Sequence, residues 1–466
     1  MDHMSTLDST FLDVEDGTTH MHIGSCAVFE GPAPAYDEIV SLIASKLPSI
    51  PRYRQKVRFV PGGIGRPVWV DDAHFDFGYH VRHSALPPPG CEKDLNALMG
   101  RLMSHELDRR RPLWEAWVIE GLPEGQWALI SKVHHCMVDG VSGTDLITSV
   151  LDAVAEAQPP APDTWEAAPE PSGAMLVLES IGNLAAIPWR QVRDPRLIIT
   201  SRRVADRVRE TFDGLRTVER HLAPQPELSI TGSIGPQRRW AAVRTELADV
   251  KAIKVAFGGT VNDVVLAVVA GAFRNLLQAR NEDPDHAVLR SLVPVSVRAA
   301  GDHTANNQVS ALLAELPIDV ADPIERLASI HEQMQQLKGS GQAELTAALP
   351  EIAGLALPFF VTLGLRSAGA IARNHPQRTV NTVTTNVPGP QYPLYAAGRE
   401  MVAYHPFVPI SQGVRIGVAV MSYNGGMSFG VTGDYDTVPD LDLFCRAIEA
   451  GIGDLVDQAA LVGSRP

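Results

Sequence analysis

Two adjacent histidines, His134 and His135, end a short apolar run and precede an aspartate and a glycine in SKVHHCMVDGVSG, residues 131–143. A neutral imidazole, with an ordinary pKa of about 6.5, accepts a proton at neutral pH and can deprotonate an attacking alcohol or thiol. Adjacent side chains on an extended backbone point to opposite faces, so we expect only one of the two rings to reach a reaction centre. Asp139 could close the turn or hold it through an ion pair, and Gly140 permits backbone conformations that a side chain forbids.

A strand and a helix are predicted on either side of this motif. Residues 128–133 are mainly apolar and predict a buried strand that ends at His134. After Gly140, Ser142 can cap a helix with Asp145 three residues further on, which is close to a capping box. Apolar residues then recur with helical spacing at Leu146, Ile147, Val150, Leu151 and Val154. The histidines are therefore expected at a strand-loop-helix junction, where side chains can face a cleft.

Three interpretations of the histidine pair compete at this point: a catalytic base, a metal site and a structural pair. A metal needs a third and usually a fourth ligand, and the sequence has neither HExxH nor a set of Cys and His at metal-binding spacing. Core histidines satisfied by backbone groups are common, so a structural role is the ordinary explanation of an isolated HH. The longer string HHxxxDG at this junction is much more specific than HH alone.

Length and composition limit the class of protein. A chain of 466 residues exceeds the roughly 250–300 residues that one core serves, which predicts two domains. The hydrophobic content of 45% and charged content of 20% are typical of a globular protein. A net charge of -14 disfavours nucleic acid as a partner. Four widely spaced cysteines without a CxxC pair fit a reducing compartment.

Two segments bear on export and membranes. The acidic N-terminus MDHMSTLDSTFLDVEDG does not support a signal peptide. The apolar stretch 352–365 is well short of the ~20 residues of a spanning helix and contains Pro358, so a soluble or peripheral protein is expected.

The chain is predicted to divide into three parts, at 1–155, 156–225 and 226–466. The first part alternates strand-like runs (HIGSCAVFEG, WALISKVHH) with helical patterns (YDEIVSLIASKL, DLNALMGRLMSHEL). The second opens with AEAQPPAPDTWEAAPEPSG, which predicts an exposed linker. The third contains a buried helix (DVVLAVVAGAFRNLL), a strand (HAVLRSLVPVSV) and a hairpin that turns at Asn424-Gly425.

The linker becomes helical and basic from about residue 174. Between Arg190 and Arg220 it carries nine arginines against five acids, a local balance of +4. A solvated connecting helix whose arginines pair with acids elsewhere is favoured over contact with an anionic lipid surface, and both interpretations remain open.

The string HHxxxDG resembles the signature of the chloramphenicol acetyltransferase-like acyltransferases, which include peptide-synthetase condensation domains and the bacterial wax ester synthase/diacylglycerol acyltransferases. Further stretches are similar to the last group and occur in its order along the chain: LDSTFL, HMHIG, LDRRRPLWEAWVIEGL (107–122), TVNDVVLA (260–267), VPVSVR (293–298) and NTVTTNVPGP (381–390). Only residues from about 157 to 225 lack a match. The DFGWG segment of several relatives in the wider superfamily is absent, which removes support for a condensation domain.

The resemblance implies an α/β fold of two chloramphenicol acetyltransferase-like domains, each a mixed sheet with flanking helices, joined by a partly helical linker, with the active site at the domain interface. It implies that His135 is the general base and that His134 and Gly140 shape its loop. Asp139 would hold the loop rather than relay a proton, and Arg298 is the candidate partner of its carboxylate.

The companion motifs have structural explanations as well. Pro112, Leu113 and Trp114 are chemically inert, so packing or a tunnel wall is favoured over catalysis. The resemblance implies that Asn262 and Asp263 line or brace the site from the second half; alternatively, Asn262 caps the helix that starts near Asp263. VPGP is foremost a rigid turn. Cys136 is expected to serve packing.

The reaction that the resemblance implies is direct acyl transfer from a long-chain acyl-CoA, as co-substrate, to a hydroxyl group, with no bound cofactor, metal or covalent acyl-enzyme. The chain looks like actinobacterial members that make triacylglycerol, so diacylglycerol is favoured over a fatty alcohol as acceptor, although no residue separates the two. We expect a cytoplasmic protein, peripheral at the inner membrane or at lipid droplets. The alternatives are a same-fold acyltransferase for another lipid alcohol and a non-catalytic lipid-binding or droplet protein. An esterase is disfavoured because a GxSxG elbow is missing.

Overall fold

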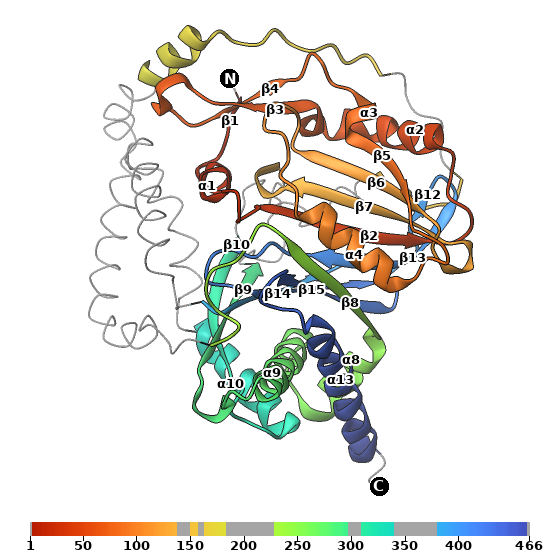
Figure 1. The fold of residues 1–466 in the computed structure, drawn as a ribbon, viewed down its shortest axis with the longest axis vertical. Helices are drawn as coiled ribbons and strands as arrows, with labels where there is room; N and C mark the ends of the chain where they lie inside the picture. Colours follow the sequence, from red (N-terminus) through yellow and green to blue (C-terminus); the bar gives the residue numbers. More distant parts are fainter. Residues whose placement is uncertain are drawn as a thin grey trace.

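Two six-stranded mixed sheets, one in each half of the chain, form the framework of the molecule (Figure 1). The computed structural model describes residues 2–137, 150–156, 163–182, 228–296, 309–339 and 380–463. Helices flank both sheets, as the sequence predicts. The flanking helices are α1 (Thr6–Val14), α2 (Tyr36–Lys46), α3 (Phe77–His80), α4 (Glu92–Met103), α8 (Leu247–Phe257), α9 (Val261–Ala279), α10 (Pro323–Gly339) and α13 (Leu441–Gly463).

The first sheet carries the histidine motif. Its order is β12-β13-β2-β7-β6-β5, with strands Tyr395–Ala396, Arg399–Phe407, His22–Phe29, Trp127–His134, Trp114–Glu120 and Val81–Ala85. Neighbouring strands are antiparallel except β5 and β6, which are parallel. Every residue of β7 is buried, which explains why this strand reads as a nearly continuous apolar run. A small sheet of β1 (Asp2–His3), β4 (Val68–Asp71) and β3 (Gln55–Arg58) lies beside it.

The second sheet has the order β10-β9-β11-β14-β15-β8. Its strands are Val309–Leu316, Leu289–Ser296, Thr382–Pro388, Ile416–Tyr423, Gly426–Asp434 and Arg238–Glu246. The central strand β11 is parallel to β9 and β14, and the other neighbours are antiparallel. Figure 1 shows α8, α9, α10 and α13 gathered on one side of this sheet. The predicted hairpin is confirmed, because Asn424 and Gly425 both have positive φ, at 42° and 87°.

Helix α9 is the buried helix that the sequence predicts. It is long and apolar enough to cross a membrane by composition, but most of it is buried inside the second half. Its apolar side chains belong to a core that also takes residues from α8, α10, α13 and the second sheet. In this structure it is a core helix.

The second half contributes a strand pair to the first sheet. Strands β12 and β13 come late in the chain but pair with β2 and complete the first sheet. The backbones approach so closely that a Cβ on Gly430 of β15 would lie 1.7 Å from the carbonyl oxygen of Pro406 in β13. The division 1–155 and 226–466 stays a prediction, and the sheet boundary does not follow it at this strand pair.

Residues 163–182 lie against the small sheet. Arg54 forms an ion pair with Asp163, and Lys56 and Arg58 form ion pairs with Glu170. A helix at 173–182 follows and buries Leu176 against the core cluster of Val60, Val68 and Val70. The predicted linker is largely exposed here but anchored by charge, and the helix begins where the sequence predicts it. The arginine-rich stretch 190–220 lies outside the described residues.

One predicted helix is too long. Val150 is the last helical residue before a bend, and Asp152 forms an isolated antiparallel bridge with Tyr395. Leu151 and Val154 were expected to continue the helix, which is wrong, because the backbone groups of Asp152 pair with strand β12 instead. The predicted cap at Ser142 lies outside the described residues.

Candidate active site

The stretch 107–122, called here the PLW segment after Pro112, Leu113 and Trp114, fixes the end of the strand that carries the histidines. The carbonyl of Leu113 accepts the backbone N–H of His134 at 2.9 Å. Trp114 is fully buried, donates its indole N–H to the carbonyl of Tyr53 at 2.8 Å, and stacks on His80 with ring centroids 4.6 Å apart. Pro112, Leu113 and Trp114 therefore act by packing and backbone pairing, as the sequence analysis favours.

His135 lies just beyond β7, at the first position of a 3₁₀ turn (His135–Met137). Its backbone N–H donates to the carbonyl of Met21 at 2.8 Å, and its ring stacks on Phe11 of α1 with centroids 4.0 Å apart. Burial, together with the nearby His134, lowers the pKa of His135 to about 4, so the ring is neutral at physiological pH. Nδ1 is buried without a partner among the described residues.

His134 occupies a different environment from its neighbour. Its side chain is almost completely buried, and its Nδ1 accepts the backbone N–H of Cys136 at 3.2 Å. Nε2 therefore carries the proton, and it lies 3.5 Å from a carboxylate oxygen of Glu15. The Cys136 thiol lies 3.0 Å from Nδ1, and burial raises its pKa well above the usual value, so it remains a thiol. The predicted division of labour between the two histidines is consistent with these separate environments.

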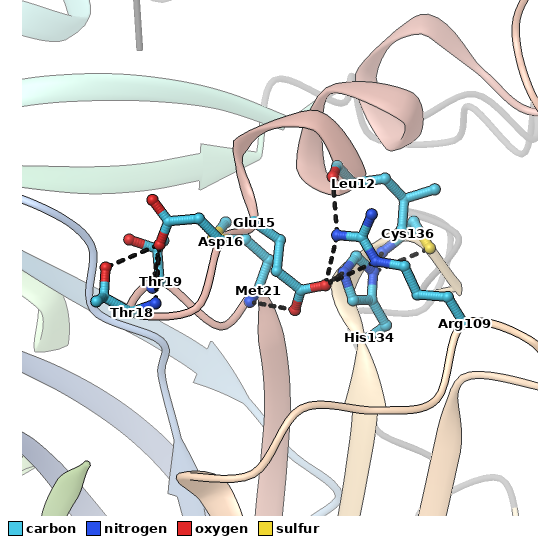
Figure 2. Close-up of polar contacts among 9 residues, drawn as sticks. All are labelled: Leu12, Glu15, Asp16, Thr18, Thr19, Met21, Arg109, His134 and Cys136. Atoms are coloured by element: carbon cyan, nitrogen blue, oxygen red, sulfur yellow. Dashed lines mark hydrogen bonds and ion pairs between the residues drawn. The ribbon is translucent and has the colours of Figure 1, made fainter. Parts of the chain in front are cut away.

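Glu15 is the group that joins the first residues of the chain to the motif (Figure 2). Its carboxylate accepts the backbone N–H of Met21 at 3.1 Å and the guanidinium of Arg109 at 2.8 Å, and it approaches His134. Burial alone raises the pKa of Glu15, but the contacts with His134 and Arg109 outweigh it and hold the pKa at about 2. Since the carbonyl of Met21 holds His135, one carboxylate supports both histidines.

A tight turn after Glu15 brings Met21 into place. One oxygen of Asp16 accepts the N–H and O–H of Thr18 at 2.9 and 2.8 Å and the N–H of Thr19 at 2.8 Å. Figure 2 shows this turn beside the Glu15 carboxylate. Aspartate side chains commonly stabilise turns in this way.

Asn262 and Asp263, the two predicted site residues of α9, lie in the first turn of that helix, next to its N-cap. Thr260 is the N-cap of α9, and it exchanges hydrogen bonds with Asp263, which accepts the Thr260 N–H at 2.8 Å. Asp263 also lies 2.8 Å from Nδ1 of His331. Asn262 therefore does not cap the helix, which corrects that alternative: the threonine hydroxyl takes this place. The described contacts of Asp263 lie within the second half and do not join it to His135.

Three predicted site residues, Asp139, Gly140 and Arg298, lie outside the described residues. Within the described ranges, no group of three or more His, Cys, Asp or Glu side chains is arranged to hold a metal ion.

The sequence analysis missed four groups that contact the histidines or support them, namely Phe11, Glu15, Met21 and Arg109. Phe11 and Met21 lie inside the matched stretches LDSTFL and HMHIG, and Arg109 inside the PLW segment. Their positions were a usable signal, but only the fold shows that these segments meet.

Replacing Glu15 by glutamine should destabilise the protein in a pH-dependent way. A pKa held near 2 rather than 4.5 corresponds to roughly 3 kcal/mol of stability at pH 7. Because the folded-state pKa is the lower one, this contribution is complete above the unfolded pKa and is lost as pH falls from about 5 toward 2. Urea unfolding at neutral and acidic pH measures it, with Glu30→Gln at an exposed position as control. A pH-independent difference between Glu15→Gln and the wild type would contradict this account.

Comparisons with known proteins show the family of the chain. The model of the wax ester synthase/diacylglycerol acyltransferase catalytic domain matches residues 4–265, and that of the family's C-terminal domain matches 305–455. A probable diacylglycerol O-acyltransferase, tgs1, of Mycobacterium tuberculosis is 37% identical over 98% of this chain and 96% of its own length. A second one, tgs2, is 33% identical over 98% and 99%.

Solved structures give the same result. The wax ester synthase/diacylglycerol acyltransferase from Marinobacter aquaeolei VT8 aligns with a TM-score of 0.68 and 30% identity, over 98% of this chain and 100% of that one. The starter condensation domain of rhizomide synthetase, with a TM-score of 0.57 and 14% identity over 98% and 94%, shares the fold alone. The expected fold class is confirmed. The chain belongs to the wax ester synthase/diacylglycerol acyltransferase family.

Proposed function

We propose that this protein transfers the acyl group of a long-chain acyl-CoA to diacylglycerol and so makes triacylglycerol, with His135 as general base. The observation that carries the proposal is the state of His135: a neutral imidazole at a strand end, fixed through its backbone N–H and its ring face. The names of the Mycobacterium relatives support diacylglycerol as acceptor.

The chemical step needs only one base. Nε2 of His135 takes the proton of the acceptor hydroxyl while the oxygen of that hydroxyl attacks the carbonyl carbon of the thioester. The C–S bond breaks when the resulting tetrahedral intermediate collapses. The imidazolium then returns the proton to the CoA thiolate. An ester and free CoA are the products, and the enzyme is regenerated without a covalent intermediate.

The supporting residues act on geometry. His134 and Glu15 do not contact the reacting atoms in this scheme; they hold the strand end and the Met21 carbonyl that fixes His135. A rigid base matters because a small misplacement of a catalytic group costs orders of magnitude in rate. Asp139 and Gly140 complete this loop in the proposal, with Arg298 as the partner of Asp139.

Two alternatives rest on particular observations. The name of the Marinobacter relative covers wax ester synthesis as well, so a fatty alcohol or another lipid alcohol is the competing acceptor. In a non-catalytic lipid-binding protein, His135 would serve only the packing that it makes with Phe11.

An acceptor panel with a His135 variant tests the proposal. Release of CoA from a long-chain acyl-CoA should be fast with diacylglycerol, slower with hexadecanol and negligible without acceptor. His135→Ala should lower the rate by about 10²-fold or more, since a positioned base contributes about 10²–10⁴-fold. The matched control is His286→Ala, which removes an exposed histidine of the second half. A folded His135→Ala protein with the wild-type rate would refute the base assignment, and no acceptor-dependent release would refute the transferase.

The pH profile gives a second test. Because the pKa of His135 is lowered to about 4, the ring should stay neutral and active from pH 8 down to about 5, and kcat/KM should fall only as the ring is protonated near pH 4. Rates measured in short assays, with circular dichroism to confirm folding at each pH, check this. An acidic limb centred near pH 6.5 would contradict a desolvated base.

We further propose a cytoplasmic protein that is peripheral at the inner membrane or at lipid droplets, since diacylglycerol dissolves in lipid rather than in water. The supporting feature is the charge balance of the segment 190–220. Sedimentation with vesicles rich in phosphatidylglycerol should recover the protein at low salt and release it at high salt. Recovery that is equal with and without vesicles would argue against this location.

A further inference from the structure

A cleft of about 1040 Å³ is lined by helix α4 of the first half and, in the second half, by the start of strand β8, the loop after β15 and the start of α13. The helix and the strand also pack directly on each other, because a Cβ on Gly100 would lie 2.7 Å from the carbonyl oxygen of Arg238. One wall therefore comes from each half. None of the reaction steps proposed above uses this cleft.

Positive charge is concentrated in the cleft. Its lining includes Lys93, Arg101, Arg238 and Arg239 against only two acids, Glu92 and Asp442. This local excess of two positive charges stands in a chain whose net charge is -14. Among the described residues, none of the four cations forms an ion pair with a carboxylate.

Arg238 is the most unusual of these cations because it is only 4% exposed. Its guanidinium donates to the backbone carbonyls of Gly235, Gln237 and Thr18, none of which carries a charge. Buried guanidinium groups are ordinarily neutralised by a contacting anion. Asp434 and Asp16 favour the charged form of Arg238 electrostatically without an ion-pair contact, and the carboxylate of Asp434 accepts from Gly235 and Thr437 instead.

Arg238, in the lining of the cleft, is hydrogen-bonded to the segment that precedes Met21. Arg238 donates its backbone N–H to the hydroxyl of Ser104 at 2.8 Å, at the end of α4, and its guanidinium to Thr18. Thr18 belongs to the turn that leads to Met21, whose carbonyl holds His135. Arg238 therefore links the lining of the cleft to the turn that positions the base.

We propose that this α4–β8 cleft binds the phosphate groups of an anionic ligand, and that the phosphoadenosine end of acyl-CoA is this ligand. The assignment to CoA rests on the proposed transferase function; the phosphate chemistry rests on the cations alone. CoA carries its phosphates at the end remote from the thioester, so a phosphate site outside the reaction centre is what its shape requires. Arginine and lysine are the side chains that bind phosphate. The exposed ring of Tyr435, which already stacks on Arg239, adds an aromatic surface to the lining.

The test changes exposed residues, so that the hydrogen bonds of Arg238 with Ser104 and Thr18 remain intact. The double variant Lys93→Glu/Arg101→Glu reverses two exposed charges of α4 that form no ion pair with a carboxylate within the described part of the chain. Arg101→Lys keeps the charge and serves as the conservative variant. Lys251→Glu, on the exposed side of α8, is the matched charge reversal outside the cleft. Thermal unfolding of all four proteins should agree.

The first readout is binding of adenosine 3′,5′-bisphosphate to the full-length chain by titration calorimetry. The double variant should weaken the Kd by about ten-fold or more, while Arg101→Lys and Lys251→Glu should stay within about two-fold of wild type. Unchanged binding in the double variant, or a larger loss in Lys251→Glu, overturns the site.

The second readout is steady-state kinetics with acyl-CoA. The double variant should raise the KM for acyl-CoA by a similar factor and leave kcat unchanged, because the lost contacts are equal in the ground and transition states. An unchanged KM in an active double variant overturns the CoA assignment while the transferase function stands. If the wild type binds adenosine 3′,5′-bisphosphate and the double variant does not, but neither protein transfers acyl groups, the phosphate site is supported and the transferase function is refuted.

A vesicle-binding assay distinguishes CoA from a lipid headgroup, which carries the same phosphate chemistry. If the double variant loses binding to phosphatidylglycerol vesicles but keeps its affinity for adenosine 3′,5′-bisphosphate, the ligand is the headgroup, and the CoA assignment is wrong. If vesicle binding is unaffected and nucleotide binding is lost, the proposal holds.

Discussion

The buried carboxylate of Glu15 is the contact on which the histidine motif depends. It is almost inaccessible to water, and a charge in such a place is tolerated only when it is paired and hydrogen-bonded. Arg109 supplies the opposite charge, and the N–H of Met21 and the ring of His134 supply the remaining contacts. Each of these partners comes from a different segment, so one ion holds together the end of α1, the start of β2, the PLW segment and the end of β7.

This arrangement separates the base from the groups that hold it. Among the described residues, the backbone N–H of His135 donates to Met21 and its ring stacks on Phe11, whereas the contact with a carboxylate is made by His134. A base in direct contact with a carboxylate would have its charged form stabilised and its pKa raised. With the charge one residue away, His135 stays neutral, while its position is still fixed.

Much of the framework could be predicted from the sequence, because its signals are local. The buried run of β7, the apolar α9 and the Asn424-Gly425 turn each carry their own periodicity or turn chemistry. The resemblance of the string HHxxxDG to a family signature implies that His135 is the base, and this role stays a prediction. What escaped prediction depends on contacts between distant segments: the stack of Phe11 on His135 joins positions more than a hundred residues apart, and no local pattern marks such a pair.

The end of the predicted helix near Val154 failed for the same reason. Apolar spacing favoured a continuing helix, but the backbone of Asp152 pairs with Tyr395, and tertiary pairing overrides a weak local preference. The cap at Thr260 shows the opposite case. Its signal, a threonine three residues before an aspartate, is local and present in the sequence, one residue away from the Asn262-Asp263 pair.

Strand β13 has a consequence for how the chain is made. During synthesis on the ribosome, β2 emerges among the first residues, but its partner on one side, Arg399–Phe407, follows only after most of the chain has been translated. Until then β2 presents an open edge, which is the kind of surface that pairs wrongly with other chains. The first sheet therefore remains incomplete until most of the second half has been synthesised. Because β14 and β15 follow β13 along the chain, the second sheet is also incomplete when β13 emerges, and both sheets depend on the C-terminal part of the chain for their last strands.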